Sequence, residues 1–182
     1  LESIYKEKPF KTLVLDSLTS WFKLALTYAI ELSRTYGLKE QPTIERPQLV
    51  GYGIRSTATK EMAFNLINWC RKHGVNCVFI AHKGEMVKDE QTGIMYNSIG
   101  LSGDIPNEIA RWCDECWMMG VDGTGKRLLQ VQPLSNARPL KTRMFSSDVS
   151  TVDATTLSLS QLIDAWRSTG KINNDTLTHL KG

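Results

Sequence analysis

An aspartate stands directly after a short run of uncharged, mostly apolar residues near the start of the chain. The run from Thr12 to Leu15 is rich in strand-forming residues and predicts a strand buried on both faces of a parallel sheet. Asp16 closes the run, and Ser17 and Thr19 follow as candidate N-caps of a helix. Open α/β sheets bind ligands at the carboxyl ends of parallel strands. Asp16 is therefore a candidate ligand-binding carboxylate; the alternative is that it only caps the next helix.

A second buried strand is predicted over residues 75–81, and it too ends at a polar residue, His82. The segment from Lys83 to Asp104 that follows contains four glycines. Within it, residues 85–89 and 94–98 are expected to pair as a hairpin around the turn Gln91-Thr92-Gly93.

Helices and strands alternate along the remaining chain, which predicts an α/β fold with a largely parallel sheet ending in antiparallel hairpins. An apolar helix is expected from Leu18 to Tyr36, with Leu24, Tyr28 and Leu32 on one stripe and Gly37 as its stop. The further expected segments are a loop over 38–53, a helix from Ser56 or Thr57 to Gly74, a helix over 106–113, strands over 115–121, 128–134 and 142–145, a helix over 160–166, and a tail from Gly170.

Two short motifs resemble binding sites, but their context favours other roles. Residues 120–127 nearly match the G-x-x-x-x-G-K-[ST] phosphate loop, yet Arg127 replaces the hydroxyl residue and a strand follows instead of a helix. The segment is better interpreted as a hairpin turn. Cys113 and Cys116 have the spacing of zinc ligands without a second close pair, which favours free thiols and leaves metal binding open.

Composition predicts an ordinary globular protein, and the scattered cysteines favour a reducing cytoplasm. The net charge of +3 is too small to demand a polyanionic partner. The sequence has no apolar run long enough to cross a bilayer and no secretory signal at its start, so no membrane partner is expected. The sequence begins without Met and in the middle of a pattern, which suggests a fragment.

The order of these parts resembles the RecA-like ATPase core, and most closely the phage-type RecA-like nucleotide-binding proteins linked to DNA recombination and single-strand annealing. The resemblance covers roughly residues 10–145 and depends on the order and spacing of short motifs. It implies a three-layer sandwich with a mostly parallel sheet and antiparallel C-terminal strands, from which the N-terminal phosphate-loop strand is missing. The implied division is a partial core over 1–146 and a linker, short helix and tail over 147–182.

The resemblance also implies roles for single residues. Asp16 would be the Walker B acid that holds Mg²⁺ through water, with Ser17 beside it at the nucleotide. His82 would be a sensor of the γ-phosphate, where glutamine is common in the family. Lys141 and Arg143 resemble a K-x-R pair that reaches a neighbouring subunit's nucleotide, where a cation neutralises developing charge. The alternatives are a polar strand end for His82 and an exposed strand face for the pair.

The resemblance implies a protein of a phage or its bacterial host, with single-stranded DNA and further copies of the chain as partners. The segments over 38–53 and 83–104 match the two loops that face DNA along the axis of a filament or ring; the oligomer could also be a dimer. The candidate DNA contacts are Lys83, Lys88, Tyr96, Gly100 and Gly103. Among them, the aromatic ring of Tyr96 could stack on a base. The alternative is that the basic residues are ordinary solvated surface.

One departure limits the expected activity. The family's phosphate loop and catalytic glutamate precede the Walker B strand, and this sequence has only about ten residues there. The chain alone is therefore expected to bind ATP and Mg²⁺ weakly and not to hydrolyse ATP. Two other functions stay open: a non-catalytic α/β interaction module, and a relative of replicative helicases or circadian-clock ATPases.

Overall fold

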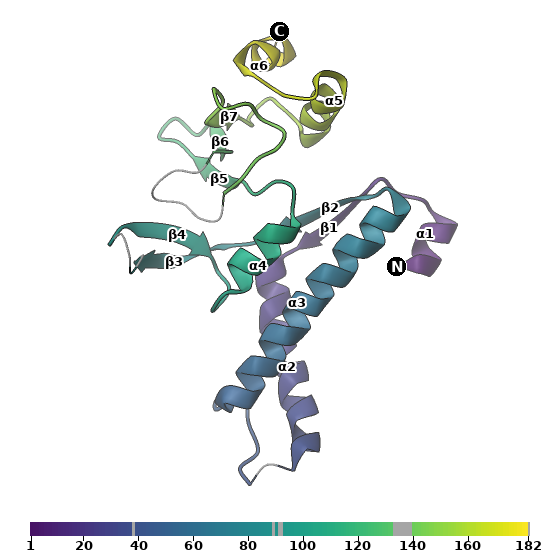
Figure 1. Ribbon diagram of the computed structural model, residues 1–182, viewed down its shortest axis with the longest axis vertical. Coiled ribbons are helices and arrows are strands. Elements are labelled where there is room, and N and C mark those ends of the chain that lie inside the picture. The colour runs from purple at the N-terminus through teal and green to yellow at the C-terminus, as the bar shows by residue number, and fades with distance from the viewer. Residues whose placement is uncertain (38, 89, 91–92, 133–139, 182) are drawn as a thin grey trace. The chain divides into compact units, whose positions relative to one another are not determined.

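The computed structural model describes residues 1–37, 39–88, 90, 93–132 and 140–181, and these form two compact units. The first unit contains residues 1–84 and 99–112, and the second contains residues 85–98 and 113–182. The elements in chain order (Figure 1) are α1 (Glu2–Glu7), β1 (Thr12–Asp16), α2 (Leu18–Ser33), the 3₁₀ turn η1 (Arg34–Tyr36), α3 (Gln48–His73), β2 (Asn76–Ile80), β3 (Lys83–Lys88), β4 (Met95–Ile99), α4 (Ile105–Trp112), β5 (Met118–Val121), β6 (Arg127–Gln130), β7 (Thr151–Asp153), α5 (Leu159–Thr169) and α6 (Asn174–Lys181).

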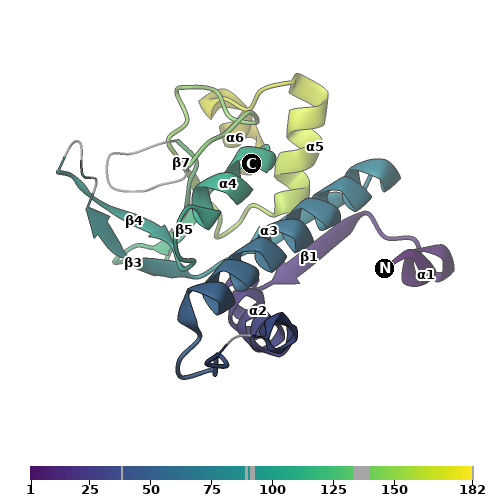
Figure 2. The ribbon, with the colours of Figure 1, turned by 60° about the horizontal axis from the view of Figure 1, so that its bottom comes forward.

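The first unit is built on two parallel strands and two long helices. β1 and β2 pair in parallel from Thr12 opposite Asn76 to Asp16 opposite Ile80, which confirms both predicted strands. α3 runs beside α2 in Figure 1 and in Figure 2 and packs against it. Gly51 permits this close approach, because a Cβ atom there would lie 3.2 Å from Cδ1 of Ile30.

Local signals in the sequence set most helix ends. The hydroxyl of Ser17 caps α2, and Gly37 follows η1 in the left-handed conformation, as expected. Gly74 ends α3 in the same conformation. The start of α3 was predicted wrongly: residues 48–53, expected in a loop, are helical. Pro47 already has helical dihedrals at the N-cap, so the glycines that suggested a loop lie inside the helix.

Two predicted apolar surfaces are more exposed than the sequence suggested. β1 is not buried on both faces, since its side chains alternate between exposed and half-buried and Val14 is 51% exposed. β2 is its one partner among the described strands. On α2, Leu24 and Tyr28 are exposed, while the buried side is formed mainly by small side chains such as Ala25 and Ala29.

The predicted hairpin is present, and it forms a sheet of its own. β3 and β4 pair as a two-stranded sheet. The strand bounds match the expected 85–89 and 94–98 to within two residues, apart from Asp89, which lies outside the described residues, as do the predicted turn residues Gln91 and Thr92.

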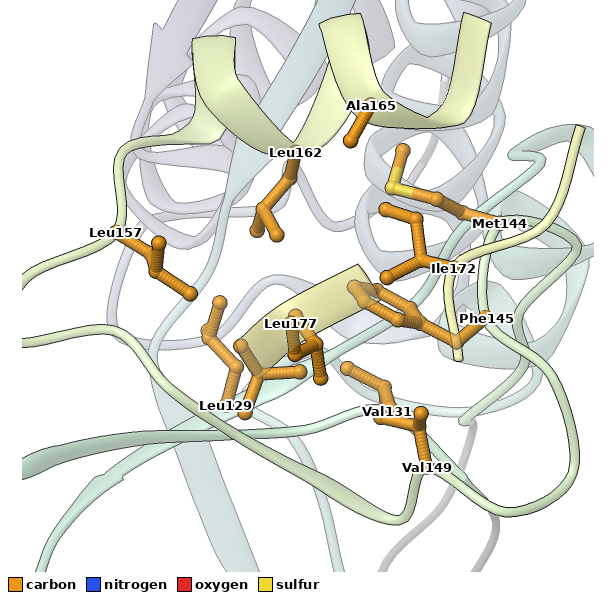
Figure 3. Close-up of a cluster of buried hydrophobic side chains, with 11 residues drawn as sticks. Leu129, Val131, Met144, Phe145, Val149, Leu157, Leu162, Ala165, Ile172 and Leu177 are labelled. Atoms are coloured by element: carbon orange, nitrogen blue, oxygen red, sulfur yellow. The ribbon is translucent and has the colours of Figure 1, made fainter. Parts of the chain in front are cut away.

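The second unit has an antiparallel sheet beside its own hydrophobic cluster. β6 pairs with β5 on one side and with β7 on the other. α5 and α6 contribute side chains to the cluster beside this sheet (Figure 3). The cluster comprises Leu129, Val131, Met144, Phe145, Val149, Val152, Leu157, Leu162, Ala165, Ile172 and Leu177. Its members come from both sides of residue 146, and the domain division predicted there stays a prediction.

The second unit differs from the prediction in three elements. Residues 142–145 form no strand; Lys141 and Phe145 make isolated bridges to Cys116 and Ile172. β7, a true strand, gave no clear signal because it has only three residues. The expected tail contains α6, which is anchored by the buried side chains of Ile172 and Leu177.

The α/β class is confirmed, but the described strands form three separate sheets in place of one mostly parallel sheet. Within the described residues, no helix is long and apolar enough to cross a membrane.

Candidate functional site

The carboxyl ends of β1 and β2 bring two predicted site residues to one edge. Asp16 is the last residue of β1 and lies opposite Ile80, and His82 follows two residues later. The side chains of both residues are exposed. The Asp16 carboxylate makes no hydrogen bond or ion pair with any described residue. Its oxygens are therefore available to a ligand, as expected of an acid at this edge.

Ser17, predicted beside Asp16 at the nucleotide, is engaged within the protein. It is 5% exposed, and its hydroxyl accepts a hydrogen bond from the Ser20 N–H at 3.0 Å and lies 2.9 Å from the Ser20 hydroxyl. This is the capping interaction that starts α2. Asp16 thus offers the more available oxygens, and a nucleotide-binding role for Ser17 stays a prediction.

The backbone of His82 is fixed from two directions. Its N–H donates to the hydroxyl of Thr19 at 2.9 Å, and its carbonyl accepts from the N–H of Gly100 at 2.8 Å. Thr19 is 8% exposed, so this hydroxyl is a buried structural contact. The sequence suggested Thr19 only as an N-cap and gave no signal for a contact 63 residues away.

Two glycines bring the hairpin close to the same edge. A Cβ atom on Gly84 would lie 3.0 Å from the Cα atom of Gly100 and 3.0 Å from the carbonyl oxygen of Ile99. A Cβ atom on Gly100 would lie 3.2 Å from the carbonyl oxygen of His82. These contacts are to backbone atoms, which cannot rotate away, so this crossing of the segments around Gly84 and Gly100 favours glycine at both positions.

The predicted DNA contacts lie on or next to the hairpin. Lys83 and Lys88 are the first and last residues of β3, so strand alternation directs them to opposite faces. Tyr96 lies on β4 and is half-buried. Gly100 is part of the crossing, and Gly103 lies before α4 with a left-handed φ of 63°. Their contact with DNA stays a prediction.

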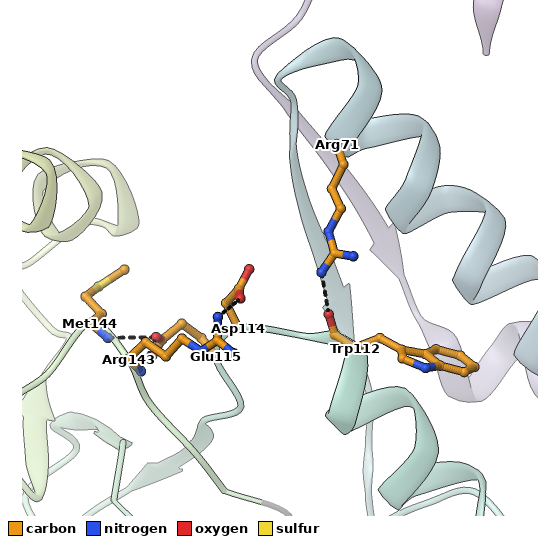
Figure 4. Close-up of polar contacts among 6 residues, drawn as sticks. All are labelled: Arg71, Trp112, Asp114, Glu115, Arg143 and Met144. Carbon is orange, nitrogen blue, oxygen red and sulfur yellow. Dashed lines mark hydrogen bonds and ion pairs between the residues drawn. The ribbon is translucent and has the colours of Figure 1, made fainter.

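In the second unit, Glu115 holds the segment that contains Lys141 and Arg143. Its carboxylate accepts hydrogen bonds from the N–H groups of Arg143 at 2.6 Å and Met144 at 2.8 Å, the second of which is drawn in Figure 4. It also accepts from the Thr142 hydroxyl at 2.6 Å. The Arg143 guanidinium lies 3.0 Å from the Asp114 carboxylate, and both side chains are exposed. This arrangement fixes the backbone and leaves the Arg143 side chain accessible; the role of both cations stays a prediction.

Cys113 and Cys116, with zinc-like spacing, form no disulfide. A hydrogen bond with Cys113, together with burial, raises the pKa of the Cys116 thiol above its ordinary value. Among the described residues, no group of three His, Cys, Asp or Glu side chains has the arrangement of a metal site.

The phosphate-loop look-alike is a hairpin turn, as predicted. Val121 pairs with Arg127 in the antiparallel ladder of β5 and β6, and Gly125 adopts a φ of 84°. The Asp122 carboxylate accepts the backbone N–H groups of Thr124 at 2.8 Å and Lys126 at 3.0 Å. Hydrogen bonds from Thr124 hold the pKa of Asp122 below its ordinary value. The donors of a phosphate cradle are used within the turn.

A family model described as an AAA domain matches residues 4–143, more than three quarters of the chain. The matched range includes Asp16, His82, Lys141 and Arg143. No curated protein and no solved structure matches the chain. The match indicates an ATPase-type, nucleotide-binding domain of the P-loop class.

Proposed function

Because the chain belongs to the AAA domain family, we propose that it is the Walker B part of a RecA-like, ATP-dependent DNA-handling protein of the phage recombination or annealing type. The observation that carries the proposal is the exposed Asp16 carboxylate at the carboxyl edge of two parallel strands, within the matched range. This carboxylate makes no hydrogen bond or ion pair with a described residue, so its oxygens are available to bind a ligand at the strand ends.

ATP with Mg²⁺ is the proposed ligand, and the Asp16 carboxylate suits the metal ion of this ligand. Mg²⁺ is commonly held by one or two carboxylates, with water and substrate phosphates completing its shell. Asp16 would supply such a carboxylate, and the metal would neutralise charge on the phosphates. His82, with its backbone fixed, would present its imidazole at the same edge.

Substituting Asp16 tests this proposal. In the whole gene product that carries this sequence, Asp16→Asn should lower ATP hydrolysis by about a hundred-fold or more, because a neutral amide holds Mg²⁺ poorly. Glu31→Gln, an exposed carboxylate change on α2, is the control and should hydrolyse ATP normally. Normal hydrolysis by Asp16→Asn would contradict the assignment.

Single-stranded DNA is the proposed ligand of the β3–β4 hairpin and of the loop that follows it. Lys83 and Lys88 are exposed cations at the two ends of β3. A double Lys83→Ala/Lys88→Ala variant should bind an oligothymidylate more weakly and with a shallower salt dependence, since each lost phosphate contact removes about 0.7 from the slope. Fluorescence anisotropy at several salt concentrations measures this. An unchanged affinity and slope would remove the hairpin from the DNA-binding surface.

A non-catalytic interaction module is the second candidate, favoured by one observation. The 182 residues contain no G-x-x-x-x-G-K-[ST] sequence, and the nearest match is a hairpin turn. A whole gene product that neither binds nor hydrolyses ATP would support this candidate over the first.

A further inference from the structure

Arg55 of α3 is a half-buried cation without a negatively charged partner. Its guanidinium carbon lies 4.0 Å from the centroid of the Phe22 ring and 4.9 Å from that of Tyr52. Its Nε atom is shielded from solvent and makes no hydrogen bond with any described residue. No carboxylate of the described residues lies within ion-pair distance of it. Burial lowers the pKa of Arg55 from its ordinary value, although the group stays charged.

Desolvated cations in proteins are usually paired with an anion, because removing a charge from water is costly. The two aromatic rings compensate this cost in part through cation–π attraction. They supply no hydrogen-bond acceptor, so Nε is left without a partner. An oxyanion at the Nη groups would provide the missing negative charge, since the guanidinium fork matches phosphate geometry.

The loop between β4 and α4 supplies further donors beside Arg55. Arg55 donates to the hydroxyl of Ser102 at 3.2 Å. Ser102 and Gly103 are exposed, and their backbone N–H groups donate to no described residue. The space beside Gly103 is open, with no atom within 4 Å of where a Cβ would lie. On either side the loop is anchored by the buried side chains of Leu101 and Ile105.

We infer that Arg55 and the loop around Ser102 form a binding site for a phosphate group. The site lies wholly within the first unit. This inference rests on the proposed function in one respect: the backbone of single-stranded DNA is the expected source of the phosphate. A free nucleotide has the same chemistry, and the experiment separates the two sources.

The test compares the wild type with Arg55→Met, which keeps an apolar stem on the two rings and removes the charge. Arg34→Met, at an exposed position after α2, is the matched control with the same change in net charge. Binding of a labelled oligothymidylate is followed by anisotropy at several salt concentrations. Loss of one phosphate contact should reduce the slope of log affinity against log salt concentration by about 0.7. At about 0.1 M salt, this corresponds to an affinity about five-fold lower. Arg55→Lys should lose less, because it keeps the charge without the fork.

A second arm uses inorganic phosphate alone. Phosphate should raise the unfolding midpoint of the wild type above that in chloride of equal ionic strength, and Arg55→Met should lose this increase. If the wild type binds no oligonucleotide, the DNA part of the proposed function fails, and a phosphate effect that depends on Arg55 still supports the site with a nucleotide as the source. If Arg55→Met fails to fold, Arg55→Lys and Ser102→Ala decide by the same measurements. Variants that match Arg34→Met in both arms overturn the inference.

Discussion

Asp16 of the first unit and three carboxylates of the second unit are used in opposite ways. In the second unit, Glu115, Asp122 and Asp148 each accept hydrogen bonds from nearby protein groups. In the first unit, the Asp16 carboxylate accepts none from a described residue, and Arg55 has no anionic partner there. The hydrogen bonds of these three carboxylates stabilise the second unit, whereas Asp16 and Arg55 are the two groups of the first unit that we propose as ligand contacts.

Burial differs between the cluster of the second unit and strand β1 of the first. The cluster contains side chains with almost no exposure, such as Val131, Phe145 and Ile172. Strand β1 leaves Val14 half exposed. We therefore expect a substitution in the cluster to cost more stability than one at Val14.

The largest expected effect is at Phe145. This side chain is 2% exposed and packs edge-on against Trp117, with ring centroids 5.7 Å apart. Phe145→Ala should lower the free energy of unfolding by about 3–5 kcal/mol, because it removes apolar contacts and leaves a cavity. Val14→Ala, at a 51% exposed position, should cost less than about 1 kcal/mol. Urea titrations of both variants measure the difference; equal losses would contradict this contrast in burial.

A smaller effect on stability is expected at Gly84, where the chain lies against Gly100. Gly84→Ala should destabilise the protein by about 1–3 kcal/mol, since the new methyl would meet the backbone of Ile99 and Gly100. Gly53→Ala is the matched control on an exposed face of α3, where no atom lies within 4 Å of the new methyl. It should stabilise by about 0.5–1 kcal/mol, as alanine does inside helices. A Gly84→Ala variant as stable as wild type would show that the crossing is looser than described.

The smallest effect concerns pH and Asp148. Hydrogen bonds from the Ser146 hydroxyl and the Asn174 N–H hold the pKa of Asp148 below its ordinary value. A carboxyl group with a depressed folded-state pKa stabilises the protein above its unfolded-state pKa, and this contribution is lost as the pH falls through the folded-state pKa. Asp148→Asn should therefore lower the unfolding midpoint at neutral pH and matter less in acid, below about pH 4. The same comparison for Asp16→Asn should show no such loss at neutral pH.

The sequence predicted features that depend on neighbouring residues and missed those that depend on distant ones. The strand ending at Asp16, the cap at Ser17 and the turn around Asp122 all follow from local chemistry, and the structure contains them. The contact between Thr19 and His82 and the crossing of Gly84 with Gly100 require knowledge of which segments meet.

Apolar periodicity also misled at particular residues. The stripe of Leu24, Tyr28 and Leu32 has helical spacing, but the close approach of α3 at Gly51 buries the side of α2 that carries Ala25 and Ala29. Small residues that allow helices to approach carry little hydrophobic signal in a sequence. The segment from Gly170 was expected to be a tail because its few apolar residues are short of a strong pattern, yet Ile172 and Leu177 are buried.

The central claim is that Asp16 is held for a ligand and contributes little to folding. Its most direct test is the unfolding midpoint of the wild type and of Asp16→Asn, each with and without millimolar ATP and Mg²⁺. We predict that the wild type and Asp16→Asn have equal unfolding midpoints without nucleotide. Mg-ATP should raise the midpoint of the wild type alone, by a few degrees because binding is weak. A variant that melts several degrees lower without nucleotide, and a wild type whose midpoint does not respond to Mg-ATP, would contradict it.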